Sequence, residues 1–209
     1  MTDRTGSHSP EIETLAAQGA ASSTALDGLL AAVGPDRVAH PVREASAEAL
    51  KLVAVRRPAA LLAHWDELLA LADCDNAFSR TIAIHVIANL APSDAEGRLS
   101  AVLDRLYDHL GDAVSVAGHL LQVSPQIALA RPELRGRITA RILDLERLAK
   151  ADRLGLLRAY AIEALEACLA PAEWTPEAIG FVRAGLADDS PKARKLAAEV
   201  LGRLDAPTR

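Results

Sequence analysis

The chain has 209 residues, of which half are hydrophobic and only 3% are aromatic. This aliphatic, aromatic-poor composition favours closely packed helices over strands. The formal net charge of −5 argues against a protein that mainly grips a nucleic-acid backbone, because that role needs a basic surface.

The elements predicted along the chain are helices that come in pairs. Residues 1–21 are rich in Ser, Thr, Gly and Ala with no firm period, so we expect a flexible N-terminal tail with at most a short helix at 11–17. Helical periodicity between Pro and Gly breakers predicts five pairs: 24–33 with 41–55, 58–72 with 77–90, 95–110 with 113–123 and a short piece to 130, 132–149 with 153–169, and 175–187 with 191–204. In the third of these pairs, Ser124-Pro125 is expected to break or kink the second helix and to let the array bend there.

The second helix of each pair repeats one pattern of residue types. In the last copy, Arg194 is followed by a small residue at Ala197, a polar one at Glu199 and an aliphatic pair at Val200 and Leu201. A hairpin with this pattern cannot bury its apolar stripe alone, so the sequence predicts a stacked α-solenoid. The small residues recur in steps of 37, 34, 44 and 36 residues, a spacing that fits two helices and their turns, at Ser46, Ala83, Ala117, Ala161 and Ala197.

Residues 188–204 run Asp-x-x-Pro-x-x-Arg-x-x-Ala-x-x-x-Leu, and residues 75–90 give a second good match. This pattern resembles the HEAT repeats of the armadillo-type fold, and the resemblance covers about residues 24–204. It implies an all-α, right-handed α-α superhelix of about five HEAT-like hairpins, in a repeat domain at 22–205 with a short C-terminal tail at 206–209. It also implies ladders between neighbouring repeats, built from turn aspartates and helix arginines: Asp36, Asp75, Asp152 and Asp189 with Arg43, Arg80, Arg158 and Arg194.

In HEAT-like arrays the second helices usually line the concave face, so their outward positions are the expected binding groove. These positions are charged in the outer repeats and carry neutral hydrogen-bonding groups in the middle two. Such a groove suits a peptide or protein segment better than a nucleic acid. The predicted partner-binding residues are Glu48, His85, Asn89, His119, Gln122 and Glu163.

No metal, cofactor or catalytic residue is predicted. His85 and His119 occupy equivalent positions one repeat apart, and the usual interhelix spacing of about 10 Å is too wide for both to bind one ion. Iron-holding HEAT-repeat hydroxylases use His-Glu dipeptides, and none of the six histidines here precedes a Glu. HEAT-like DNA glycosylases use a basic cleft, which these second helices lack. Trp65 and Trp174 are therefore expected to be packing residues.

Two functions follow from the sequence as hypotheses. The first is a non-catalytic HEAT-repeat scaffold that binds a protein or peptide on the concave face of its second helices. The alternative is a HEAT-like enzyme or lyase-type subunit that holds a small ligand or a nucleic-acid base between repeats, which needs a deep pocket with converging ionisable groups. Cys74 and Cys168 lack metal-type spacing and no apolar run reaches eighteen residues, so we expect a cytoplasmic protein with no membrane partner.

Overall fold

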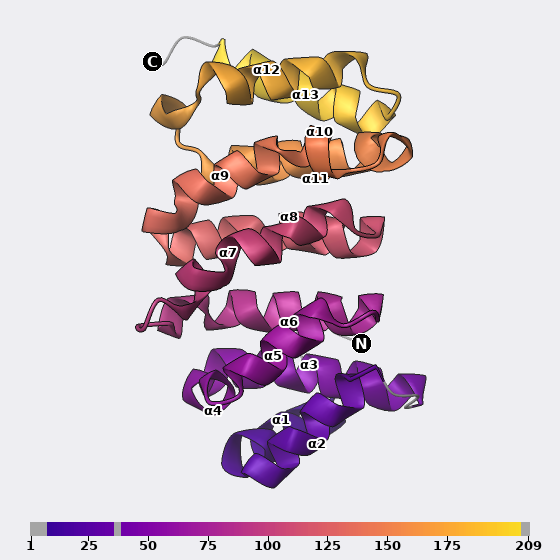
Figure 1. Cartoon of the computed structure of the whole chain (residues 1–209), viewed down its shortest axis with the longest axis vertical. Helices are drawn as coiled ribbons and strands as arrows, with labels where there is room; N and C mark the ends of the chain where they lie inside the picture. The colour runs from indigo at the N-terminus through magenta and orange to yellow at the C-terminus, as the bar shows by residue number, and fades with distance from the viewer. Residues whose placement is uncertain (1–7, 36–38, 206–209) are drawn as a thin grey trace. The chain divides into compact units, whose positions relative to one another are not determined.

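The computed structural model describes residues 8–35 and 39–205, and every regular element within these ranges is a helix. The all-α class predicted from the sequence is confirmed. The chain divides into two compact units, an N-terminal unit of residues 1–99 and a C-terminal unit of residues 100–209 (Figure 1).

In the N-terminal unit, α1 and α2 both pack on α3, α3 packs on α6, and α5 covers α6. Side-chain caps begin several helices; for example, the Asn76 side chain accepts from the backbone of Ser79 at the start of α6. The helices of this unit are α1 (Pro10–Ala21), α2 (Ser23–Val33), α3 (His40–Arg56), α4 (Pro58–Leu62), α5 (Trp65–Asp73), α6 (Ala77–Leu90) and the short η1 (Ala91–Ser93).

Helix α1 corrects the expectation of a loose tail over residues 1–21. Ser9 caps it by accepting from the backbone N–H of Ile12 at 3.4 Å. Ile12 and Ala16 are buried, and Gly19 lies so near α2 that a Cβ there would stand 2.8 Å from a methyl of Leu29. Small residues hid the helical period in the sequence, but they allow close packing of α1. Residues 1–7 and 206–209 lie outside the described residues.

A packed α1 predicts that Ile12→Ala lowers the free energy of unfolding by about 2 kcal/mol, because it deletes buried methyl groups. Urea denaturation followed by circular dichroism measures this. Glu11→Ala is the matched control, since Glu11 is exposed in the same turn and its loss should change stability by less than about 0.5 kcal/mol. Equal stability of the two variants would mean that α1 is the loose tail that the sequence suggested.

The single helix expected at 58–72 is two helices. α4 ends at Leu62 and α5 begins at Trp65, with His64 at φ −104° and ψ 25° between them. Arg98 donates to the freed carbonyl of Leu62 at 2.5 Å, which satisfies the backbone at the break. Trp65 is buried, as expected for a packing residue.

In the C-terminal unit, the long helices α8, α11 and α13 pack in that order, with α9 and α12 against them. The helices predicted at 132–149 and 175–187 each end in short separate turns. The elements of this unit are α7 (Arg98–Asp108, whose first two residues belong to the N-terminal unit), η2 (His109–Gly111), α8 (Val114–Ala130), η3 (Pro132–Leu134), α9 (Arg135–Leu143), α10 (Leu145–Leu148), α11 (Ala151–Cys168), η4 (Pro171–Glu173), α12 (Pro176–Ala184), η5 (Gly185–Ala187) and α13 (Pro191–Leu204).

The break expected at Ser124-Pro125 does not occur, because α8 runs without interruption through Pro125. Proline removes one backbone donor from the helix. The buried Ser124 hydroxyl, however, donates to the Leu120 carbonyl at 2.8 Å and accepts from the Tyr107 hydroxyl at 2.7 Å. The first of these hydrogen bonds lies within α8, and the second joins α8 to α7 next to the proline.

The ladder of turn aspartates and helix arginines predicted from the sequence is formed only in part in the N-terminal unit. Arg43 on α3 contacts the start of α6, but through an asparagine: its guanidinium donates to Asn76 Oδ1 at 3.3 Å. Arg80 lies 3.7 Å from Asp75, which belongs to its own turn. Asp36, the partner expected in the first repeat, lies outside the described residues.

In the C-terminal unit the link between repeats comes from Arg158 on α11. Its Nε lies 3.1 Å from Asp188 Oδ2, and its Nη2 donates to Glu146 at 2.8 Å. The side chains of Arg158 and Asp188 are each only 8% exposed, so this ion pair is buried. The sequence predicts Asp189 for the ladder, and the aspartate that pairs with Arg158 is the preceding residue, Asp188. Within the described residues, Arg194 does not pair with an aspartate side chain but donates to the backbone carbonyls of Asp188 and Asp189 in its own turn.

Candidate functional site

The predicted groove residues divide between the two units, three in each. In the N-terminal unit, Glu48 pairs with Lys51 Nζ at 2.8 Å, and Asn89 Nδ2 donates to the Lys51 carbonyl at 3.3 Å. His85 is half-buried on the same helix as Asn89 and also has an interaction with a neighbour. Glu48 and Asn89 thus both contact Lys51, the first at its side chain and the second at its backbone.

In the C-terminal unit the predicted residues lie on two helices that pack together. Gln122 is exposed on α8, and His119 is half-buried one turn before it. Glu163 is exposed on the neighbouring α11 and pairs with Lys192 Nζ of α13 at 2.9 Å. Two of the three residues thus share one side of α8, while the third is held in an ion pair.

The outward side of α8 carries a row of uncharged side chains that we call the neutral stripe. Its members alternate by four and three residues, so they lie along one side of the helix. Within the described parts of the chain, the exposed side chains of Ser115 and Gln122 make no hydrogen bond or ion pair with another residue. The neutral stripe consists of Ser115, His119, Gln122, Gln126 and Leu129, the last of which is 79% exposed.

The second helices beside α8 hold their charges in internal pairs. Lys192 Nζ stands 4.6 Å from the centre of the Tyr160 ring while it pairs with Glu163. Arg203 of α13 pairs with Glu166 of α11. The charged outward residues Glu163 and Glu166 of α11 are therefore neutralised by basic residues of α13.

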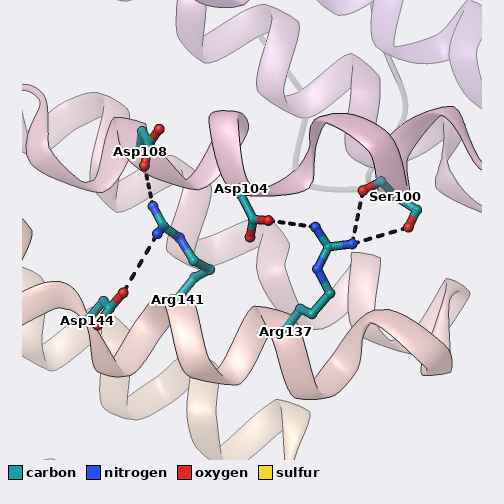
Figure 2. Close-up of polar contacts among 6 residues, drawn as sticks. All are labelled: Ser100, Asp104, Asp108, Arg137, Arg141 and Asp144. Atoms are coloured by element: carbon teal, nitrogen blue, oxygen red, sulfur yellow. Dashed lines mark hydrogen bonds and ion pairs between the residues drawn. The ribbon is translucent and has the colours of Figure 1, made fainter.

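A second row of ion pairs links the first helices α7 and α9 (Figure 2). Arg137 donates to Asp104 at 2.7 Å, and Arg141 pairs with Asp108 one turn along both helices. Arg141 also lies 3.7 Å from Asp144. Surface pairs of this kind contribute at most about 1 kcal/mol each, but they tie the two helices together.

A cavity of about 400 Å³ lies between α9 and the start of α12, lined in part by Gly136 and Thr139. The Thr139 hydroxyl is buried and has no hydrogen-bond partner among the residues that the structure describes. Arg135 and Glu173 at its edge pair with each other at 2.7 Å. The backbone N–H of Ala170 and the Arg135 guanidinium hold the pKa of the Glu173 carboxyl below its usual range. These ionisable groups are thus engaged with each other.

Both cysteines are free thiols. Burial raises the pKa of the Cys168 thiol to about 11, with a smaller opposing effect of Arg135. A thiol with that pKa stays protonated near neutral pH and is a poor nucleophile. Cys74 lies half-buried in the turn before α6, with its Sγ 3.8 Å from the Asn76 carbonyl.

Comparison with known proteins supports the fold alone. No protein-family model matches the chain, and no curated protein matches it either. Among solved structures, the chain is similar to the crystal structure of an engineered protein, with a TM-score of 0.50 and 16% sequence identity over 94% of this chain and 91% of that one. At this identity the similarity concerns the path of the backbone and says nothing of binding or catalysis.

Among the helices of residues 8–35 and 39–205, none is both long enough and apolar enough to span a membrane.

Proposed function

We propose that the chain is a HEAT-like repeat array, stacked as a right-handed α-solenoid, that binds a protein or peptide without catalysis on the side of its second helices. The observation that carries this proposal is the neutral stripe of α8, where Ser115 and Gln122 expose hydrogen-bonding groups that have no protein partner within the described residues.

The chemistry of the neutral stripe fits an extended peptide. The Gln122 amide can donate and accept at the same time, which matches the alternating N–H and C=O groups of a peptide backbone. Leu129, 79% exposed at one end of the stripe, offers an apolar contact for a partner side chain. Because the stripe itself is uncharged, recognition there depends on hydrogen bonds and shape rather than on phosphate attraction.

The neighbouring surfaces support the same choice. Glu163 and Glu166 on α11 are paired with Lys192 and Arg203, and the first helices α7 and α9 hold a row of internal ion pairs (Figure 2). A partner that bound there would first have to break those pairs. On the α8 stripe, Ser115 and Gln122 can be covered without that loss.

The proposal predicts a defined loss of peptide affinity. Peptides are selected for binding to the full chain from a random display library and are then titrated by calorimetry. His119→Ala together with Gln122→Ala should weaken binding about tenfold, the effect of losing one or two hydrogen bonds. The exposed Arg183 of α12 provides the control, and Arg183→Ala should leave the affinity within twofold (about 0.4 kcal/mol).

If the selected peptides bind the double variant as tightly as the wild type, the neutral stripe is not their binding site. His85→Ala, on the N-terminal unit, is titrated in the same series. A loss of affinity in His85→Ala alone would place the peptide on α6 rather than on α8.

The alternative, a small ligand held between repeats, is favoured by the cavity at Thr139. Its hydroxyl is a buried group without a partner within the described residues, and Gly136 lines the same cavity with open space where a Cβ would be. Gly136→Leu fills the cavity and should abolish binding of such a ligand. His119→Ala and Gln122→Ala should leave its affinity unchanged. The opposite pattern is expected for a peptide on the neutral stripe.

A further inference from the structure

Three side chains of the N-terminal unit converge on one point outside the predicted groove. Asp27 lies on α2, His64 precedes the first residue of α5, and Glu67 lies in the first turn of α5. His64 Nδ1 is 3.1 Å from Glu67 Oε1 and 3.8 Å from Asp27 Oδ1. The three ligand atoms all lie within 4.8 Å of one another.

The separation of His64 Nδ1 and Glu67 Oε1 is that of two atoms that share a metal ion, and Asp27 Oδ1 lies slightly farther away. Ligands at bonds of about 2.1 Å around a tetrahedral or octahedral centre lie about 3.0 to 3.5 Å apart. His64 and Glu67 are three residues apart, a spacing by which one helix offers an imidazole and a carboxylate from the same side. Small side-chain rotations would bring Asp27 to the same distance, since its side chain is 59% exposed.

Internal hydrogen bonding alone does not account for this cluster. The Nδ1 atom carries at most one proton, so it can donate to only one of the two carboxylates at a time. Glu67 Oε1 is the nearer acceptor at 3.1 Å, so the Asp27 carboxylate at 3.8 Å is left without that donor. A divalent cation compensates both charges while it accepts the imidazole nitrogen.

We propose that Asp27, His64 and Glu67 bind a divalent transition-metal ion of the zinc type. One imidazole with two carboxylates suits such an ion better than Ca²⁺ or Mg²⁺, which prefer oxygen ligands only. The ion joins α2 to α5, so it also fastens two helices that the sequence places in different repeats.

The proposed site leaves part of the metal free. Three protein ligands leave at least one coordination position open, which is the arrangement of reactive rather than purely structural zinc sites. Asp27 and Glu67 also line a cavity of about 430 Å³ between α2 and α5, together with Leu30, Leu71 and Cys74. A water or an acidic group of a bound molecule can take the open position from that side.

The test is a titration of the metal-stripped full chain with Zn²⁺ by calorimetry, repeated with Co²⁺ to record its visible absorption. We expect one ion per chain at this site and affinity at least about tenfold weaker in Asp27→Asn, in Glu67→Gln and in His64→Gln. Saturating Zn²⁺ should raise the melting temperature by about 5 °C in the wild type and not in Asp27→Asn.

His40 and Glu44 supply the matched control, because they form an exposed histidine-carboxylate pair at 3.6 Å. His40→Ala should leave Zn²⁺ affinity unchanged. Asp27→Asn should leave the fold intact, because Asp27 is exposed. Circular dichroism checks that each variant is folded. No Zn²⁺ binding by the wild type, undiminished affinity in Asp27→Asn and Glu67→Gln, or a loss in His40→Ala instead would each overturn the proposal.

Discussion

Replacing Arg158 by alanine is expected to lower the free energy of unfolding of the C-terminal unit by about 3 to 5 kcal/mol. Arg158 is buried against Asp188, pairs with Glu146 and stands 5.4 Å from the centre of the Phe181 ring. Its removal leaves the Asp188 carboxylate buried, with the backbone N–H of Ser190 as a remaining donor at 2.8 Å. Urea denaturation of the unit measures the loss.

A double-mutant cycle with Asp188→Asn separates the charge from the packing. Once Asp188 is uncharged, Arg158→Ala no longer strands a buried carboxylate, so its cost should fall by at least about 1 kcal/mol. An additive cycle would show that Arg158 acts through packing alone.

Gly155 gives a second test of the same buried pair, because the effect of Gly155→Ala on stability should change sign when Asp188 is removed. A Cβ at position 155 would stand 2.6 Å from Asp188 Oδ1, so Gly155→Ala must push the carboxylate away from Arg158 and Ser190. It should destabilise the wild type. In an Asp188→Ala background the clash is gone, and the same change should stabilise α11 by up to about 1 kcal/mol, the usual preference for Ala over Gly within a helix.

Replacing Tyr107 by alanine is expected to cost about 3 to 5 kcal/mol, because it opens a large cavity beneath α8. The ring is fully buried, and its hydroxyl donates to Ser124 at 2.7 Å. Tyr107→Phe keeps the ring and should cost only about 1 kcal/mol at neutral pH, the value of one hydrogen bond.

The same side chain makes stability depend on pH in the alkaline range. Burial raises the pKa of Tyr107, an effect that the hydrogen bond to Ser124 only partly opposes. The unfolded chain gives up this proton near pH 10, before the folded chain does. Its contribution to stability is therefore complete below pH 10 and is lost as the pH rises toward the raised folded-state value.

Denaturation curves at pH 8 to 11 check this, with phenolate absorbance recorded in parallel. One of the two tyrosines should ionise only as the unit unfolds. Tyr107→Phe should remove that part of the alkaline loss of stability. An equally steep loss in Tyr107→Phe would contradict the assignment.

The helical class and most helix positions could be predicted because breakers and period are local properties. Asn76 and Ser190 stand at helix starts as the sequence indicates, and both caps are made. Helix α1 was predicted only as a short helix at 11–17, because Gly19 and small neighbours weaken its apolar period. The continuity of α8 was not predicted, because Pro125 was expected to break a helix that in fact runs through it.

In the candidate sites too, features set by one helix could be predicted, and contacts between separate helices could not. The outward position of Gln122 follows from helical spacing on α8 alone. The pairing of Glu163 with Lys192 depends on which hairpins pack together, which one sequence does not reveal. The cluster at His64 escaped for the same reason, since Asp27 reaches it from a separate helix.

The most direct measurement of the central claim is site-specific photo-crosslinking of the full chain in native lysate. A photoreactive phenylalanine is placed at Gln122 on the neutral stripe or at Arg183 on α12, both of them exposed, and covalent products are identified by mass spectrometry. We expect a discrete crosslinked partner from position 122, which a selected peptide competes away, and none from position 183. The same products from both positions, or a product from 183 alone, would contradict binding on the second helices.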